Sequence, residues 1–275
     1  MSPSLQLVSI DLRVADLARS VEFYTGQLGL AVLNSGAGRV ELGLAAGAVA
    51  AGAGNPEVML TLTEVRPAPP ARSDAAGLFH AALLLPTRAA LGAWLRFAAE
   101  RGVKFDGFAD HGVSEAIYFA DPDGNGLEFY ADLPRETWPF APNGELAMVT
   151  RALDVPALLA TAAPASAVPL AGAHWGHLHL RVTDLDRSEK FYRDLLGVVL
   201  TQGTFPGARF LAADGYHHHL GLNTWGRPRA SQSPDALGLA EATFARAGVA
   251  APQSRRDPDG IALKIVAARG DFAGR

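Results

Sequence analysis

Asp16-Leu-Ala-Arg-Ser-Val-Glu-Phe-Tyr24 recurs in the second half of the chain as Asp184-Leu-Asp-Arg-Ser-Glu-Lys-Phe-Tyr192. A second motif, Asp121-Pro-Asp-Gly124, recurs as Asp257-Pro-Asp-Gly260. Two motifs repeated in the same order indicate an internal duplication. The two motifs lie closer together in the second copy than in the first, so the second copy has lost part of the chain between them.

Each half contains a smaller unit. Apolar and polar residues largely alternate over 7–14, which predicts a strand. A helix is predicted over 16–28, with Asp16 as its N-cap and Gly29 after its end. Short strands are predicted near 31–33, 39–44 and 58–63, which makes a βαβββ unit. The same order begins again at Leu78: a strand to residue 85, a helix over 88–101, and strands near 117–120 and 127–130. A third unit begins at Gly176, and a truncated fourth unit ends at Ala267.

The missing part is expected at the start of the fourth unit. Arg101-Gly-Val103 matches Ala247-Gly-Val249, and the spacing of the motifs puts most of the loss before this point and the rest after it. Residues 226–234 stand opposite the apolar strand that begins at Leu78, but they are too rich in Pro, Ser, Gln and Arg for a core strand. We therefore expect the fourth unit to lack its first strand.

The predicted class is α+β, with tandem βαβββ modules that form curved mixed β-sheet cups. The expected divisions are 1–140 for the first pair of modules, an Ala/Pro-rich connection over 141–173, and 174–275 for the third module and the truncated fourth. A short helix is expected over 154–161 within the connection. An eight-stranded cup of this kind has room for one small ligand.

The composition excludes several classes of protein. Of the 275 residues, 49% are hydrophobic and 19% are charged, which is typical of a globular chain and not of a disordered one. The net charge of −4, without a basic patch, argues against nucleic acid as a partner. The absence of cysteine excludes disulfides and thiolate chemistry. We see neither a membrane span nor a signal peptide, and expect a cytoplasmic protein with no membrane partner.

Histidines gather around the second and third units. His80 and His177 lie in the first strands of these two units, and Glu128 lies in the last strand of the second, between apolar neighbours. A carboxylate in such surroundings needs a partner, because burying it alone is costly. Two imidazoles and one carboxylate are the ligand set of non-haem Fe(II) oxygenases. His174 and His179 are interpreted as structural. Residues 216–225 are expected to be β-like, with His218 on one face and His217 and His219 on the other.

The motifs also resemble a known family. The segments with Asp-Leu-x-Arg-Ser, Phe-Tyr and Leu-Gly are similar to the vicinal oxygen chelate superfamily, which includes glyoxalases, bleomycin resistance proteins and extradiol dioxygenases. Longer strings are similar to the catechol 2,3-dioxygenase group; they cover residues 77–80, 110–118, 121–130, 176–179 and 215–225.

This resemblance implies an extradiol dioxygenase that cleaves a catechol-type or hydroquinone-type ring with Fe(II) and O₂, although Mn(II) or another divalent metal also fits. It implies that His80, Glu128 and His177 are the metal ligands. It further implies His218 as the acid–base residue and His111 and Tyr118 as residues that bind the substrate.

The corresponding positions elsewhere in the chain do not repeat this set. Ser9 stands at the position of His177 in the first unit, and Lys264 at the position of Glu128 in the fourth. The site therefore requires the second and third units together, either within one chain or across the homodimer that we expect.

Two other functions fit the same sequence. If His218 is a fourth ligand, the site is closer to that of a glyoxalase-like isomerase or lyase, which needs no O₂. A protein that binds an aromatic ligand without turnover does not need the histidine and carboxylate set at all.

Overall fold

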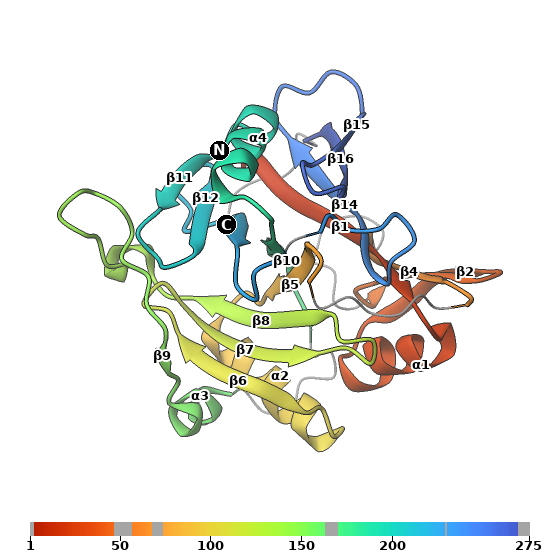
Figure 1. Ribbon diagram of the computed structural model, residues 1–275. Coiled ribbons are helices and arrows are strands. Elements are labelled where there is room, and N and C mark those ends of the chain that lie inside the picture. The colour runs from red at the N-terminus through yellow and green to blue at the C-terminus, as the bar shows by residue number, and fades with distance from the viewer. Residues whose placement is uncertain (1–2, 47–56, 68–73, 163–169, 229, 269–275) are drawn as a thin grey trace.

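The structure is a computed structural model that describes the chain except residues 1–2, 47–56, 68–73, 163–169, 229 and 269–275. Two curved mixed sheets make up the molecule (Figure 1). One has seven strands in the order β15-β16-β14-β1-β4-β3-β2, and the other has nine in the order β11-β12-β13-β10-β5-β8-β7-β6-β9. The expected α+β class and curved cups are confirmed.

The four units follow one another along the chain. The first comprises β1 (Leu5–Val14), α1 (Leu17–Glu22), η1 (Phe23–Gln27), β2 (Ala31–Gly36), β3 (Arg39–Gly43) and β4 (Val58–Glu64). The second comprises β5 (Gly77–Leu84), α2 (Arg88–Glu100), β6 (Phe105–Asp110), β7 (Ser114–Ala120) and β8 (Gly126–Asp132). The third comprises β10 (His174–Arg181), α4 (Leu185–Leu196), β11 (Val199–Gln202), β12 (Ala208–Ala212) and β13 (Leu220–Asn223). The fourth comprises β14 (Gly238–Arg246), β15 (Gln253–Arg256) and β16 (Ala262–Ala267).

The repeated aspartate begins a helix in both halves. Asp16 accepts a hydrogen bond from the backbone N–H of Arg19 at the start of α1, and Asp184 accepts one from Arg187 at the start of α4. This is the usual role of an N-cap residue. The helix predicted over 16–28 is not uniform, because its last part, η1, is a π-helix that ends at Gln27.

The prediction that the fourth unit lacks its first strand is wrong. This strand is β14, which pairs antiparallel with β1 and parallel with β16. In the second unit, β5 likewise pairs antiparallel with β10 and parallel with β8. Between β14 and β16, all of whose residues are described, the helix and the strand equivalent to β6 are missing. The prediction was wrong because Gly102 follows a helix whereas its match Gly248 follows a strand, both with φ of +77°. The described part of 226–234 forms no strand, as expected.

Each sheet combines units from both halves of the chain. The second and third units join through β5 and β10, and the first and fourth through β1 and β14. The second and third units therefore meet within one chain, which decides between the two alternatives left open by the sequence. η3 (Arg135–Thr137) precedes the connection between the halves. The connection holds β9 (Arg151–Ala152) and α3 (Val155–Thr161), and α3 is the helix expected there.

Helix α2 covers one face of the nine-stranded sheet, and the candidate site lies on the opposite face. In Figure 1, α2 lies behind β6, β7 and β8. Its Trp94 is fully buried, with its ring 4.2 Å from that of Phe129 on β8. Because side chains alternate along a strand, Glu128 points to the opposite, concave face. No helix among the described residues is long and apolar enough to cross a membrane.

Candidate metal centre and its cavity

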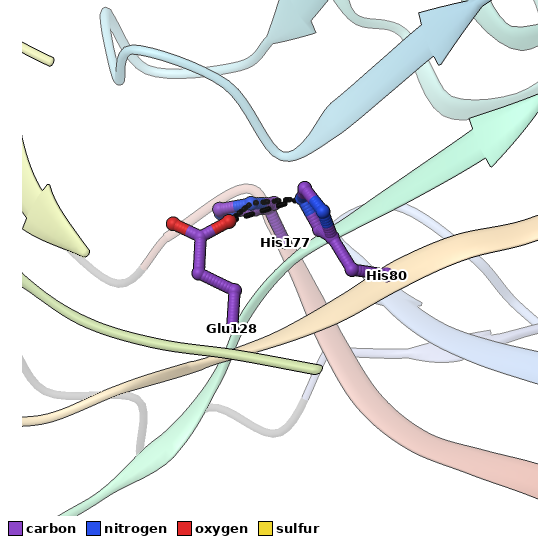
Figure 2. A group of neighbouring side chains, drawn as sticks. All are labelled: His80, Glu128 and His177. Atoms are coloured by element: carbon purple, nitrogen blue, oxygen red, sulfur yellow. Dashed lines mark hydrogen bonds and ion pairs between the residues drawn. The ribbon is translucent and has the colours of Figure 1, made fainter. Parts of the chain in front are cut away.

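Three neighbouring strands bring His80, Glu128 and His177 together. His80 lies on β5, Glu128 on β8 and His177 on β10, and the sheet places β5 between the other two strands. Figure 2 shows the three side chains pointing toward one another. One donor atom from each residue lies within 4.8 Å of the others, so the group could hold a metal ion. The sequence predicted these three residues as a ligand set.

The distances suit a single cation. Glu128 Oε2 lies 3.0 Å from His80 Nε2 and 3.1 Å from His177 Nε2, and the two nitrogens are 3.4 Å apart. Donor atoms held at about 2.0–2.2 Å from one metal ion are themselves about 3 Å apart, as these are. Nε2 is the nitrogen that the His177 ring presents to the carboxylate, and Nδ1 of the same ring is buried without a hydrogen-bond partner in the described part of the chain.

The protonation states also suit a metal. Burial raises the pKa of Glu128, but the neighbouring imidazoles, His177 first, outweigh burial and hold this pKa well below its ordinary value. Burial lowers the pKa of His177 from 6.5 to about 4, although Glu128 opposes that shift. An ionised carboxylate beside a neutral imidazole is the form in which both side chains bind metals.

Glycines make room for this cluster. A Cβ atom on Gly176, next to His177, would collide with the hydroxyl of Tyr130, and one on Gly126 would collide with the backbone carbonyl of Phe79. A Cβ on Gly221 would lie 2.7 Å from the ring of His179. These strands can approach the cluster closely because the three positions carry no side chain.

A cavity of about 350 Å³ opens beside the cluster. His80 and Glu128 lie in its wall together with His111, Tyr118 and His218. The rest of the wall is largely aromatic and apolar, and includes Phe79, Val113, Met148, Phe205, Phe210 and Trp225. Concave, mostly apolar sites with a few convergent polar groups are typical of small-molecule binding.

His111 and Tyr118 are in direct contact. Tyr118 Oη lies 2.7 Å from His111 Nε2, and His111 Nδ1 lies 2.6 Å from the carbonyl oxygen of Val149. A carbonyl only accepts, so Nδ1 carries the hydrogen and Nε2 of the neutral ring accepts from the phenol. Burial, followed by the charge of Glu128, raises the pKa of Tyr118 well above 10, which keeps the phenol protonated.

The three consecutive histidines are all buried, but not in a strand. The β-like segment expected over 216–225 shrinks to β13, and residues 217–219 form the bend that precedes it. His218 lines the cavity, with its ring centroid 4.1 Å from that of His177. Its ring nitrogens do not join the three donor atoms that lie within 4.8 Å of one another in the described residues.

Two residues of the site were not expected to be part of it. His179, interpreted as structural, lines the cavity, and its Nε2 has no hydrogen-bond partner among the described residues. Trp225 stands beside it, with ring centroids 5.5 Å apart. The alternation of His177 and His179 along one strand was the available signal, because it puts both rings on the same face.

The fold and this centre define a member of the glyoxalase/bleomycin resistance protein/dioxygenase superfamily, and the chain belongs to that family. The family model matches residues 6–129 and 174–251. The chain is also 41% identical over 234 residues to a protein of Bacillus subtilis (strain 168) named catechol-2,3-dioxygenase; the match covers 83% of this chain and 78% of the relative. The resemblance expected from the sequence is thus confirmed, and the relationship supports a dioxygenase.

Solved structures agree with the fold. A putative dioxygenase from Bacillus subtilis subsp. subtilis str. 168 matches with a TM-score of 0.64 and 14% identity, covering 99% of this chain and 88% of its own. Glyoxalase I from Zea mays matches with a TM-score of 0.54 and 18% identity, covering 96% of this chain and 92% of its own. At these identities the likeness concerns the fold alone.

Proposed function

We propose that this chain is an extradiol dioxygenase that cleaves a catechol-type or hydroquinone-type ring with Fe(II) and O₂. The observation that carries the proposal is the convergence of His80, Glu128 and His177 beside an aromatic-lined cavity, with His80 and Glu128 in its wall. Similarity to a protein named catechol-2,3-dioxygenase supports the same activity.

The family and this donor group imply a divalent metal. His80, Glu128 and His177 would hold it, and two histidines with one carboxylate suit Fe(II) while leaving coordination positions open. Iron bound there would supply the Lewis-acid and redox chemistry that a diol and O₂ require.

The other polar residues of the cavity handle protons and orientation. His218 would accept a proton from a hydroxyl of the bound diol and later return it. Because Tyr118 gives its own hydrogen to His111, its oxygen is left to accept a hydrogen bond from a substrate hydroxyl. The aromatic walls would exclude water and contact the ring of the substrate.

One observation favours this proposal over a glyoxalase-like isomerase with four ligands. The nitrogens of His218 stand outside the donor group, while His80, Glu128 and His177 already lie within 4.8 Å of one another. A residue that touches the cavity but not the ligand set suits acid–base chemistry better than coordination.

The test is O₂ consumption by protein loaded anaerobically with Fe(II), measured with a panel of catechols and hydroquinones. We expect one O₂ to be consumed per diol, together with a new visible absorbance from a ring-opened semialdehyde. Glu128→Gln, which keeps the shape of the side chain but removes its charge, is the matched control and should be inactive.

Three other outcomes would reject the proposal. Conversion of a substrate without O₂ would indicate an isomerase or lyase. Binding of an aromatic ligand by metal-free protein, without turnover after loading, would indicate a binding protein. Retention of full activity by Glu128→Gln would remove the ligand role of Glu128. The homodimer and the cytoplasmic location stay predictions from the sequence.

A further inference from the structure

His217 lies directly behind His218, on the side away from the cavity. Its side chain is completely buried, and it is not part of the cavity wall, whereas His218 is. The ring of Trp138 closes over it, with centroids 5.3 Å apart. The mechanism above gives His217 no role.

A chain of hydrogen bonds runs from a carboxylate to His218 through His217. His217 Nε2 lies 2.9 Å from Asp132 Oδ1, and His217 Nδ1 lies 2.8 Å from His218 Nδ1. Asp132 is the last residue of β8, the strand that carries Glu128. The hydroxyl of Tyr216 also donates to Asp132 Oδ1, at 3.1 Å, and so helps to fix the carboxylate.

The direction of these hydrogen bonds follows from their first member. An ionised carboxylate only accepts, so the hydrogen of His217 is on Nε2. A neutral imidazole carries one N–H, which leaves Nδ1 of His217 as an acceptor. His218 must then donate from Nδ1, and its Nε2 is left without a hydrogen. Within the described residues, no protein group forms a hydrogen bond with this Nε2.

We propose that Asp132 and His217 are positioning residues that hold His218 in the tautomer with hydrogen on Nδ1, so that Nε2 can accept a proton from a bound substrate. The functional part rests on the acid–base role proposed for His218. The proton passes from a substrate hydroxyl to His218 Nε2, and the resulting imidazolium is stabilised through His217 by the Asp132 carboxylate. Rotation of the His218 ring is restrained by the same hydrogen bond.

The tautomers can be measured directly in the metal-free protein. Long-range proton–nitrogen NMR spectra of ¹⁵N-histidine-labelled protein distinguish bare from protonated ring nitrogens. We expect a bare Nε2 on His218 and a bare Nδ1 on His217. A bare Nδ1 on His218 in the wild-type protein would overturn the proposal, whatever the enzyme activity.

Asp132→Asn tests the function of the chain of hydrogen bonds. The amide can donate to His217 Nε2, which would move the hydrogen of His217 to Nδ1 and that of His218 to Nε2. We expect this change in the NMR spectrum, and in the loaded enzyme a fall in kcat of about ten- to a hundred-fold with little change in KM or metal content. Asp132→Glu, which keeps the carboxylate, should recover part of kcat. Asp106→Asn, on exposed residue Asp106 of β6 in the same sheet, is the matched control.

A second variant covers a failure of Asp132→Asn to fold. His217→Phe keeps an aromatic ring at this position but neither donates to Asp132 nor accepts from His218 Nδ1, so the same loss of kcat is expected. Wild-type kcat in either folded variant would overturn the proposal. If the wild-type enzyme turns over no diol but shows the expected tautomers, the positioning holds and the proposed dioxygenase activity fails.

Discussion

The phenol of Tyr24 donates a hydrogen bond of 3.0 Å to Asp121. Tyr192 makes the same contact with Asp257, at 2.9 Å. The two motifs that repeat in the sequence therefore bind each other: the helical motif of the first unit contacts the turn of the second, and the third contacts the fourth in the same way. An arginine of each helix adds an ion pair with the second aspartate of the turn, Arg19 with Asp123 and Arg187 with Asp259.

The hydrogen bonds between these tyrosines and aspartates should stabilise the folded protein. Tyr24→Phe removes a buried hydrogen bond to Asp121, so the free energy of unfolding should fall by about 1–3 kcal/mol. Urea denaturation followed by circular dichroism measures the change. Tyr192→Phe should have a similar effect, while Lys190→Ala, on the exposed face of α4, should have none that can be measured. Unchanged stability in both tyrosine variants would contradict the role given to the repeated motifs.

Metal affinity should depend on three side chains and not on histidines in general. Removal of a partner that supports a ligand usually costs about 10–100-fold in affinity, so His80→Ala, His177→Ala and Glu128→Ala should each cost more than about a hundred-fold. Titration calorimetry with Mn(II) under reducing conditions measures this. His219→Gln, which alters a buried histidine outside the donor group, should bind as the wild type does. Equal affinity in all four variants would place the metal elsewhere.

The stability of the metal-free protein should depend on pH. Burial lowers the pKa of His219 from 6.5 to about 4, and its Nδ1 accepts a hydrogen bond from the backbone N–H of Ala213. The unfolded state therefore binds a proton at a higher pH than the folded state. The stability contributed by the neutral ring is complete above pH 6.5 and is lost as the pH falls toward 4. His219→Gln should flatten the curve of unfolding free energy against pH in this range; an unchanged slope would refute the assignment.

Trp225 should limit the size of the substrate. Its ring lies in the cavity wall, with centroids 5.4 Å from Phe79 and 5.5 Å from His179. Trp225→Leu opens the wall, so the ratio of kcat/KM for an alkyl-substituted catechol to that for catechol should rise about ten-fold. Steady-state assays of both substrates measure the ratio. The same ratio in the variant would show that bound diols do not reach Trp225.

The sequence allowed most of the fold to be predicted because the fold rests on a repeat. Asp16 and Asp184 are N-cap residues, which the local sequence is enough to predict. The strands were predicted from the alternation of apolar and polar residues within each segment. The fourth unit was misassigned because Gly248 follows a strand and Gly102 follows a helix, although both have a φ of +77°. A local match cannot distinguish the two, since strand pairing with β1 decides the outcome.

The candidate metal group was also predictable, because Glu128 is a carboxylate between apolar neighbours and histidines stand at equivalent strands. The hydrogen bonds that hold His218 in place could not be predicted from the sequence. Asp132 and His217 are far apart in the chain, and nothing local signals their contact. The role of His179 was underestimated because a single strand histidine is most often structural. Only the folded structure shows that it lines the cavity and that its Nε2 has no hydrogen-bond partner among the described residues.

The proposed dioxygenase activity requires that both atoms of O₂ be incorporated into the ring-opened diol. The most direct measurement is mass spectrometry of the product formed from a turned-over catechol under ¹⁸O₂ by the Fe(II)-loaded protein. We expect a ring-opened product that contains both labelled oxygen atoms, allowing for exchange of the aldehyde oxygen with water. A product that carries no label, or only one labelled atom with the ring intact, would contradict it.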